Sequence, residues 1–417
     1  MINAGLTPER GQEIPPELAG LRQATVLVTG ASGFLGCRVA EYLSLGVGCT
    51  VKALVRNFGS IGLPRLARLR VELVTGDLLD PASLATAARG CDHVVHCGYG
   101  NSGDAEIRRK TNVEGTRNVL EAARSGGARK VVHISTSMVH GTPNDKTVTE
   151  DHPYQYWGRV YYDSKIEAEK VAMDYAHHQG LNVAILRPTR IYGPWSEQFT
   201  VQPIRNTKQG TAILVEDGRA KANLVYVDNV CEAILLCLWK AESSGQAFLV
   251  NDEEQVTWRE YHEAHAKMIA GAPALRSMTL ADIERHEKKQ AREVLRKSVT
   301  GALRIVKSGV RGLYQDVPLV QIPANAVISR LPQKIGAGLR ARLEAQRHPD
   351  VNPNGTGQGS AAGSPSGIPE LWRARSFAAD CWFSNEKIKS VLGYRQKVSF
   401  SEAMRLTQQW AEWARLL

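Results

Sequence analysis

The sequence predicts an α/β fold in which helices cover both faces of a doubly wound parallel sheet. Up to about residue 255, short β-rich runs alternate with helical stretches, as in sheets built from strand–helix–strand units. The chain has 417 residues and is 43% hydrophobic, which is enough for a core of two or more lobes. After about residue 270 the alternation stops and a basic helical stretch follows. We therefore expect a second, smaller C-terminal lobe that carries an insertion.

Seven short apolar runs are the expected strands of the sheet. They cover residues 25–28, 50–55, 71–75, 93–97, 130–135, 182–187 and 247–250. Helices are expected between them over residues 33–45, 83–89, 113–126, 161–179 and 230–241. Ligands of such open sheets bind at the carboxyl ends of the strands.

The first expected strand runs directly into three glycines at the start of a helix. Gly30, Gly33 and Gly36 have the spacing Gly-x-x-Gly-x-x-Gly. Gly30 permits a turn that a Cβ would obstruct, Gly33 lets the backbone approach a pyrophosphate, and Gly36 lets the helix pack tightly on the strand. The free N–H groups of this helix then face the phosphates of a dinucleotide. The intervening residues that we also expect beside this ligand are Ser32, Phe34 and Leu35.

The end of the second expected strand bears on which dinucleotide binds. Arg56 stands where an enzyme that uses NAD usually carries an acid for the ribose 2′-hydroxyl. A cation instead accommodates the 2′-phosphate of NADP. NADP is therefore the expected cofactor, and NAD is the alternative if Arg56 is only a solvated surface arginine.

A tyrosine and a lysine at the start of a long helical pattern are the candidate acid/base pair. Tyr161 and Lys165 are four residues apart, so both project from one face of the helix. A phenol has a pKa of about 10, and an ammonium group beside it favours the phenolate. Tyr161 could then act as general acid or base toward a carbinol or carbonyl oxygen, with Tyr162 as the second candidate. Thr136, at the end of an expected strand, is a candidate to hydrogen-bond that oxygen.

Three motifs occur in order, Thr-Gly-Ala-Ser-Gly-Phe-Leu-Gly, Ser-Thr-Ser-Met-Val-His-Gly and Tyr-Tyr-Asp-Ser-Lys. With them the chain resembles the extended short-chain dehydrogenase/reductases, the NAD(P)-dependent epimerase/dehydratase group, over about residues 22–265 and 371–417. The resemblance implies a Rossmann fold and a homodimer. It also implies that Tyr161 is the acid/base, that Lys165 binds the nicotinamide ribose and that Thr136 orients the substrate oxygen.

The same resemblance implies further site residues. Asp77 flanks the adenine, and the segments that contain Leu78 and Pro188 belong to the cofactor site. Asn112 supports the active site, although a residue of this type also suits a helix cap. No metal site is expected.

Departures from the family narrow the expected reaction. Ser137 and Met138 replace the Asp-Glu pair with which the sugar 4,6-dehydratases eliminate water, so that dehydration is not expected. Arg190 stands where nucleotide-sugar epimerases tend to place asparagine. The expected reaction is therefore reversible hydride transfer at a secondary alcohol or ketone.

Three hypotheses follow for the function. The leading one is an oxidoreductase or epimerase acting on a sugar nucleotide or related polyol. The alternative is a membrane-surface-associated ketone or alcohol dehydrogenase with a steroid-like, isoprenoid or lipid-linked substrate. A non-catalytic cofactor-binding scaffold is the third, and the intact Tyr161 and Lys165 argue against it.

The basic insertion holds the whole charge excess of the chain. Residues 285–347 contain fourteen Lys and Arg against four Asp and Glu, which equals the net charge of +10. On a helix over residues 295–313 the apolar side chains form one stripe beside a basic side. Such a helix can lie on an anionic membrane surface, or it can pack on the second lobe with its basic face in water. Nucleic-acid binding is not expected, because Tyr314 is the only aromatic residue of this segment.

The expected organisation divides the chain into five parts. An N-terminal extension covers residues 1–21, and the dinucleotide-binding domain covers 22–195 with a returning strand near 245–252. The substrate lobe covers 196–269 and 369–417, the insertion 270–347 and a flexible linker 348–368.

Localisation is predicted from the apolar patterning and the cysteines. No run of about 18 apolar residues exists, and the first twenty residues lack the layout of a signal peptide. The seven cysteines include no Cys-x-x-Cys pair, which fits reduced core thiols. A cytoplasmic protein is expected, with peripheral membrane contact through 285–347 as the alternative.

Overall fold

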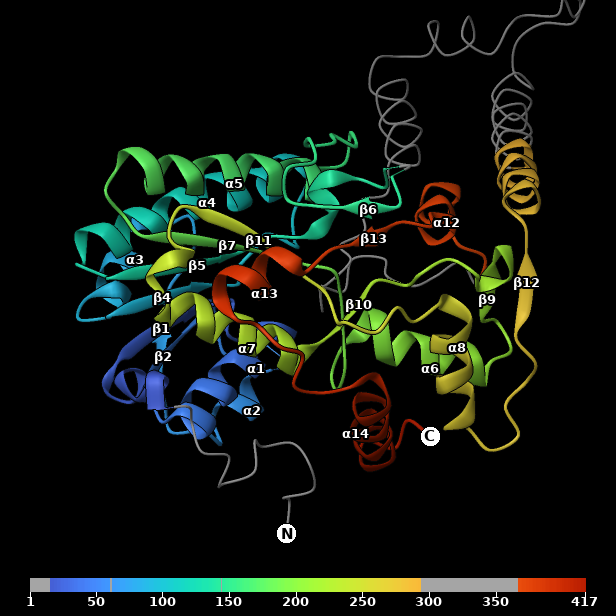
Figure 1. Ribbon diagram of the computed structural model, residues 1–417, viewed down its shortest axis with the longest axis horizontal. Coiled ribbons are helices and arrows are strands. Elements are labelled where there is room, and N and C mark those ends of the chain that lie inside the picture. Colours follow the sequence, from blue (N-terminus) through green and yellow to red (C-terminus); the bar gives the residue numbers. More distant parts are fainter. Residues whose placement is uncertain (1–15, 61, 144, 294–366) are drawn as a thin grey trace, which may run out of the picture. The chain divides into compact units, whose positions relative to one another are not determined.

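The computed structural model describes residues 16–60, 62–143, 145–293 and 367–417 (Figure 1). It divides into two compact units, one formed by Met1–Met278 with Val351–Leu417 and the other by Thr279–Asp350. Residues 280–293 of the second unit are helical. The amphipathic stripe expected over 295–313 and nearly all of the linker expected over 348–368 lie outside the described residues.

A seven-stranded parallel sheet forms the centre of the first unit, as the sequence predicts. Its strand order is β11-β7-β5-β4-β1-β2-β3, and every neighbouring pair is parallel. The strand order reverses on either side of β1, which makes the fold a doubly wound Rossmann sheet. The seven strands are β1 (Thr25–Thr29), β2 (Thr50–Val55), β3 (Val71–Thr75), β4 (His93–His96), β5 (Lys130–Ile134), β7 (Val183–Pro188) and β11 (Gln246–Val250).

Helices lie on both faces of this sheet (Figure 1). One face is covered by α3 (Pro81–Ala88), α4 (Ala105–Ser125) and α5 (Val160–His178). The other face is covered by α1 (Phe34–Glu41), α2 (Leu63–Leu66) and α7 (Val227–Trp239).

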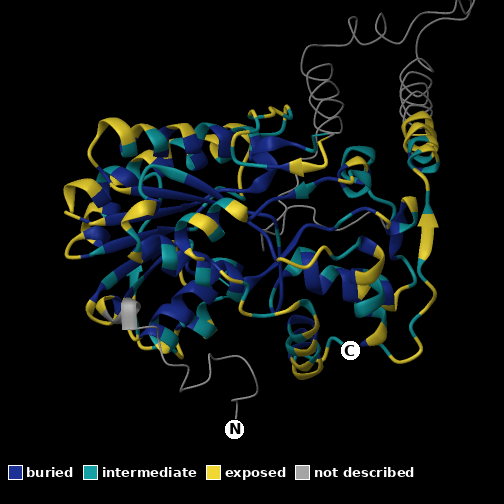
Figure 2. Cartoon of the chain, viewed as in Figure 1, coloured by how far each residue is buried: buried dark blue, intermediate teal, exposed yellow. Residues whose placement is uncertain are grey.

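Burial on both faces explains why the strands are continuous apolar runs. Along β1, Val26 and Val28 belong to the core cluster on one side of the sheet, whereas Leu27 belongs to the cluster on the other side. All three side chains are at most 1% exposed. Figure 2 shows the strands buried and the outer faces of the helices exposed.

The rest of the first unit consists of short elements, most of which fall in the expected substrate lobe; β6 and β8 fall in the expected dinucleotide-binding domain and β12 in the expected insertion. Strands pair in parallel as β8 with β10, β9 with β12 and β6 with β13. The strands are β6 (Thr147–Val148), β8 (Arg190–Tyr192), β9 (Ile213–Val215), β10 (Leu224–Tyr226), β12 (Arg276–Met278) and β13 (Trp382–Phe383). The helices are α6 (Gln202–Lys208), α8 (Trp258–Lys267), α12 (Leu371–Ala378), α13 (Glu386–Leu392) and α14 (Phe400–Trp413). Short 3-10 or π turns cover Pro16–Gln23, Tyr42–Val47, Ser137–His140, Glu197–Val201, Glu216–Gly218 and Ala241–Ser243.

Helix α4 shows the largest difference from its predicted start. α4 starts at Ala105 and not near residue 113, because Asp104 caps it by accepting a hydrogen bond from the Ile107 N–H at 2.8 Å. Its first turns are polar and largely exposed, so they show no apolar periodicity. All seven cysteines carry free thiols, and six of them are buried.

Candidate active site

A cavity of about 600 Å³ lies at the carboxyl ends of the central strands. Among the residues that line it are Tyr161 and Lys165 and all but one of the expected cofactor residues. The cofactor residues that line it are Gly30, Ser32, Gly33, Phe34, Leu35, Gly36, Arg56, Asp77 and Leu78. Pro188 does not line this cavity. It ends β7 and pairs with Val250 of β11, so this expected cofactor residue lies in the sheet.

The glycine turn is shaped by contacts that a larger residue would break. Gly30 has φ +65°, and a Cβ there would lie 2.7 Å from the Gly98 nitrogen. A Cβ on Gly36 would lie 2.3 Å from the Gly30 carbonyl oxygen. Helix α1 begins at Phe34 without a side-chain cap, so its first N–H groups remain available to a phosphate.

The end of β2 presents a cation and no acid to the cavity. Arg56 is exposed there, and the other lining residues of this loop are Asn57, Gly59 and Ser60. Asp77 follows β3, and its carboxylate accepts a hydrogen bond from the Leu79 N–H at 2.8 Å. The charged residue that this loop contributes to the cavity lining is therefore Arg56.

Tyr161 and Lys165 lie in the first turns of α5, and both are buried. The Lys165 ammonium donates a hydrogen bond to the Ile134 carbonyl at 2.8 Å, which fixes it against the end of β5. Burial lowers the pKa of Lys165 to about 8. The Tyr161 ring packs edge-to-face on Tyr99, with ring centroids 5.9 Å apart.

Asn112 lies behind this pair and does not line the cavity. Its side-chain oxygen accepts from the Gly100 N–H at 2.7 Å, and its amide donates to Ser164 Oγ at 2.8 Å. Ser164 Oγ donates in turn to the Tyr161 carbonyl at 3.1 Å. Asn112 lies in the middle of α4, whose cap is Asp104, so the helix-capping alternative is wrong. Its contacts join the loop after β4 to the turn that carries Tyr161.

A buried ion pair anchors α5 to the sheet. Arg187 of β7 and Glu169 of α5 are 2.7 Å apart, with side chains 5% and 0% exposed. The Tyr154 hydroxyl also donates to Glu169, at 2.9 Å. An ion pair so far from water depends on both partners, because either charge left alone would be costly.

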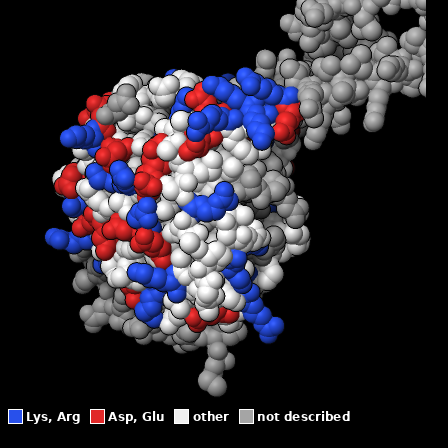
Figure 3. Space-filling view, turned by 90° about the vertical axis from the view of Figure 1, so that its right-hand side faces the viewer, with Lys and Arg blue, Asp and Glu red and all other residues white. Residues whose placement is uncertain are grey.

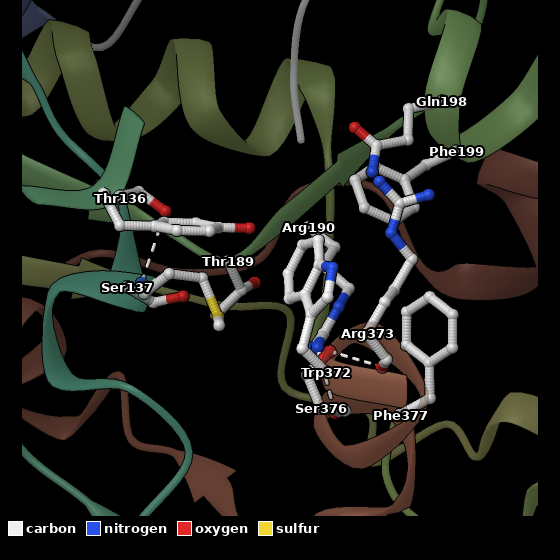
Figure 4. Close-up of a pocket in the computed structure, with 12 residues that line it drawn as sticks. Thr136, Ser137, Thr189, Arg190, Gln198, Phe199, Trp372, Arg373, Ser376 and Phe377 are labelled. Atoms are coloured by element: carbon white, nitrogen blue, oxygen red, sulfur yellow. Dashed lines mark hydrogen bonds between the residues drawn. The ribbon is translucent and has the colours of Figure 1, made fainter. Parts of the chain in front are cut away.

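A second pocket lies next to the cofactor cavity, and Figure 4 shows the residues that line it. Ser135 and Tyr161 line the cofactor cavity, and the next residues, Thr136 and Tyr162, line this pocket. Burial raises the pKa of Tyr162. Tyr161 is therefore the tyrosine at the cofactor and Tyr162 the tyrosine of the second pocket. The remaining lining residues are Ser137, Met138, Thr189, Arg190, Gln198, Phe199, Trp372, Arg373, Ser376 and Phe377.

Arg190 joins β8 to α12 at this pocket. Its guanidinium donates to the Ala222 carbonyl at 2.9 Å and to the Ser376 carbonyl at 3.2 Å. It also lies over the Trp258 ring, 5.1 Å from the centroid, and burial lowers its pKa to about 10. This role in orienting α12 is one that the sequence does not predict.

The pocket residues on α12 are also ones that the sequence does not predict. Trp372, Arg373, Ser376 and Phe377 have the i, i+1, i+4, i+5 spacing of one helix face. That spacing is the signal that could have found them. It stands far along the chain from the motifs of the site, beyond the segment expected as a linker.

Comparisons with known proteins agree with this geometry. The 2-alkyl-3-oxoalkanoate reductase of Stenotrophomonas maltophilia is 31% identical over 245 residues, which cover 56% of this chain and 72% of the relative. The 3-beta-hydroxysteroid dehydrogenase of Mycolicibacterium neoaurum is 29% identical over 253 residues, covering 57% and 68% of the two chains. The fold is similar to that of dTDP-glucose 4,6-dehydratase from Streptomyces venezuelae, solved with NAD and TYD bound (TM-score 0.62, 22% identity, 94% and 98% coverage).

A family model matches residues 26–251, which is more than half of the chain. The match includes the glycine turn, Thr136, Tyr161 and Lys165. The relatives named above are enzymes that reduce, oxidise or dehydrate their substrates. The chain belongs to the NAD dependent epimerase/dehydratase family and is an enzyme of the extended short-chain dehydrogenase/reductase type.

Proposed function

We propose that this protein is an NADP-preferring oxidoreductase that transfers hydride reversibly between its cofactor and a ketone or secondary alcohol. The observation that carries the proposal is the single cavity lined by the glycine turn, Tyr161 and Lys165. Thr136 lines the neighbouring pocket, where a substrate carbonyl would enter. The preference for NADP rests on Arg56, the one charged group at the end of β2 that lines the cavity.

Each residue of the site has a separate role in the proposed reaction. A bound nicotinamide supplies or accepts the hydride. Tyr161 donates the proton to the carbonyl oxygen in reduction and takes it back in oxidation. The ammonium of Lys165 favours the phenolate that is left behind, and the Thr136 hydroxyl holds the oxygen by a hydrogen bond.

The pocket lining favours an apolar ketone over a sugar. Aromatic side chains from two elements, Phe199 of the turn Glu197–Val201 and Trp372 and Phe377 of α12, line it together with Met138. Such a lining suits an acyl chain or a ring system, as in the oxoalkanoate and the hydroxysteroid that the relatives' names describe. A sugar nucleotide is the second candidate substrate. Arg373 in the lining favours it, because a guanidinium suits a diphosphate.

The test is a matched pair of substitutions on α5. Tyr161→Phe removes the proposed acid, whereas Tyr175→Phe makes the same chemical change where the hydroxyl only donates to Glu121. We expect Tyr161→Phe to lower kcat for NADPH-dependent reduction by about 100- to 10,000-fold and Tyr175→Phe to leave it unchanged. A 3-oxoacid, a 3-oxosteroid and a UDP-sugar serve as the substrate panel. Cofactor binding, measured by NADPH fluorescence, should persist in both variants. Full activity in Tyr161→Phe would refute the proposed role.

Membrane contact and dimerisation are further parts of the proposal. Among the described residues, no helix has the length and apolar character needed to cross a bilayer. Basic and acidic side chains are interspersed on the face shown in Figure 3. Peripheral binding therefore rests on the sequence of residues 285–347, and absence of flotation with anionic liposomes would remove it. A homodimer is expected from the family, and light scattering that reports a monomer would contradict it.

A further inference from the structure

The second pocket opens toward another compartment of about 120 Å³. The two share the lining residues Gln198, Phe199, Arg373 and Phe377, so the compartment adjoins the pocket that contains Thr136. Beyond the shared residues, the walls of the compartment include Trp258 and His262 of α8. A ligand held at Thr136 by its carbonyl oxygen can therefore extend along aromatic walls into this compartment.

Arg373 stands out among the partly buried arginines of the molecule. Arg38 pairs with Asp228 at 2.6 Å, Arg187 pairs with Glu169 at 2.7 Å, and Arg190 donates to two backbone carbonyls. The guanidinium of Arg373 makes no ion pair and no hydrogen bond with any residue that the structure describes. Its ring contact is with the adjacent Trp372, 5.4 Å from the centroid. A cation withdrawn from water without an acceptor is costly, so a site of this kind suits an anionic ligand.

The walls of the compartment hold further polar atoms without partners. Trp258 Nε1, His262 Nδ1 and Gln198 Oε1 are buried and make no hydrogen bond in the described structure. Trp258 is 5% exposed, and its indole N–H can only donate. Burial lowers the pKa of His262 to about 3, so this ring is neutral. Figure 4 shows the Arg373 side chain extending from α12 toward the Gln198 amide.

The acidic residue that lines this compartment already forms an ion pair with another arginine. Glu197 lines it, and its carboxylate is 2.8 Å from Arg205. Arg373 therefore remains the cation of the compartment without an ion pair, and the negative charge that acts on it, Glu370, is not part of the lining.

We propose that this compartment is an anion subsite that binds a carboxylate or a phosphate at the far end of the substrate. The inference rests on the proposed function and deepens it, since it makes the substrate an amphipathic ketone or alcohol with an acidic tail. The planar guanidinium of Arg373 takes two oxygens of the anion, and the Trp258 N–H is placed to donate to it as well. Phe199 and Phe377 enclose the apolar body between the acid and the reacting carbon.

The test uses ligands that lack a ketone, so its result does not depend on hydride transfer. Octanoate, octyl phosphate and 1-octanol share one chain and differ in the end group. Each is titrated calorimetrically into the full chain saturated with NADP. Arg373→Gln removes the proposed cation. Arg375→Gln is the matched control, because Arg375 lies on the same helix, is exposed and lines none of the cavities described above.

We expect at least one of the two anions to bind about 10- to 100-fold more tightly than 1-octanol. Arg373→Gln should abolish this preference, and Arg375→Gln should preserve it. Tighter binding of octyl phosphate than of octanoate would identify a phosphate tail, and the reverse a carboxylate tail. Equal affinity for anion and alcohol, an undiminished preference in Arg373→Gln, or binding of none of the ligands would overturn the proposal. Loss of activity in Tyr161→Phe, in contrast, tests only the hydride-transfer assignment.

Discussion

Replacing Lys165 with methionine should stabilise the fold near neutral pH while it abolishes activity. Burial lowers the pKa of Lys165 from 10.5 to about 8, so the folded protein opposes the charge that catalysis needs. At pH 7 the lowered pKa corresponds to a destabilisation of the folded state by about 3.4 kcal/mol. Removing the ammonium also leaves the Ile134 carbonyl without its donor, which costs about 1–3 kcal/mol. The net expectation at pH 7 is a variant between equally stable and about 2 kcal/mol more stable than the wild type.

The change in this stability difference between two pH values can be predicted more closely. The lost hydrogen bond to Ile134 costs the same at both pH values and therefore cancels. The pKa in the folded state lies below that in the unfolded state, so the penalty is fully present below pH 8. It disappears as the pH rises toward 10.5, since the unfolded chain then loses its proton as well. The wild type therefore gains stability over Lys165→Met between pH 7 and pH 9.5. With these pKa values the gain is about 2 kcal/mol.

Urea unfolding of both proteins at pH 7 and pH 9.5 measures this difference. Lys170→Met serves as the control, because Lys170 is exposed on the same helix and its ammonium contacts the Tyr156 hydroxyl and the rings of Tyr154 and Tyr156. The control variant should show the same difference from the wild type at both pH values. If Lys165→Met differs from the wild type by an equal amount at pH 7 and pH 9.5, Lys165 does not carry the lowered pKa and the reasoning fails.

Two further substitutions test the anchoring of α5 and the choice of cofactor. Arg187→Met leaves the fully buried carboxylate of Glu169 without its cation and should lower the free energy of unfolding by about 3–5 kcal/mol in urea titrations; a loss below 1 kcal/mol would show that Glu169 is stabilised by other groups. Arg56→Ala should lower kcat/KM for NADPH by about 10- to 100-fold and leave kcat/KM for NADH unchanged in steady-state assays; an equal fall with both cofactors would show that Arg56 does not contact a 2′-phosphate.

The central sheet was predictable because its strands are buried on both faces. Residues such as Val26, Leu27 and Val28 must all be apolar when helices cover both sides, which gives a continuous run that composition alone reveals. The bounds predicted for β2 and β3 agree with the structure, and those of the other five strands differ by one or two residues. The start of α4 was missed because its first turns face water and are stabilised by the Asp104 cap.

The second lobe was beyond prediction for a different reason. Its strands are two or three residues long, and some pair with partners far away in the sequence, as Trp382 of β13 pairs with Thr147 of β6. No local pattern specifies such a pair, because its stability comes from the surrounding packing.

The residues of the site also differ in whether the sequence predicts them. Residues with a local signature, such as Gly30, Tyr161 and Lys165, could be predicted because the chemistry fixes their spacing. Arg373 carries only the spacing of one helix face, which indicates packing and no particular chemistry, and it acquires a role in the site when α12 packs beside β8. Pro188 was expected at the cofactor because it lies in a family motif. In the structure it pairs with Val250 within the sheet and does not line the cavity.

The two cavities become complete at different moments of synthesis. Every residue that lines the dinucleotide cavity lies between Gly30 and Ile191, whereas the adjoining pocket also requires Trp372 to Phe377. As the nascent chain leaves the ribosome, the nucleotide's walls emerge about 180 residues before the last wall of the substrate pocket. A dinucleotide cofactor can therefore stabilise the growing chain by mass action before any substrate can bind to it.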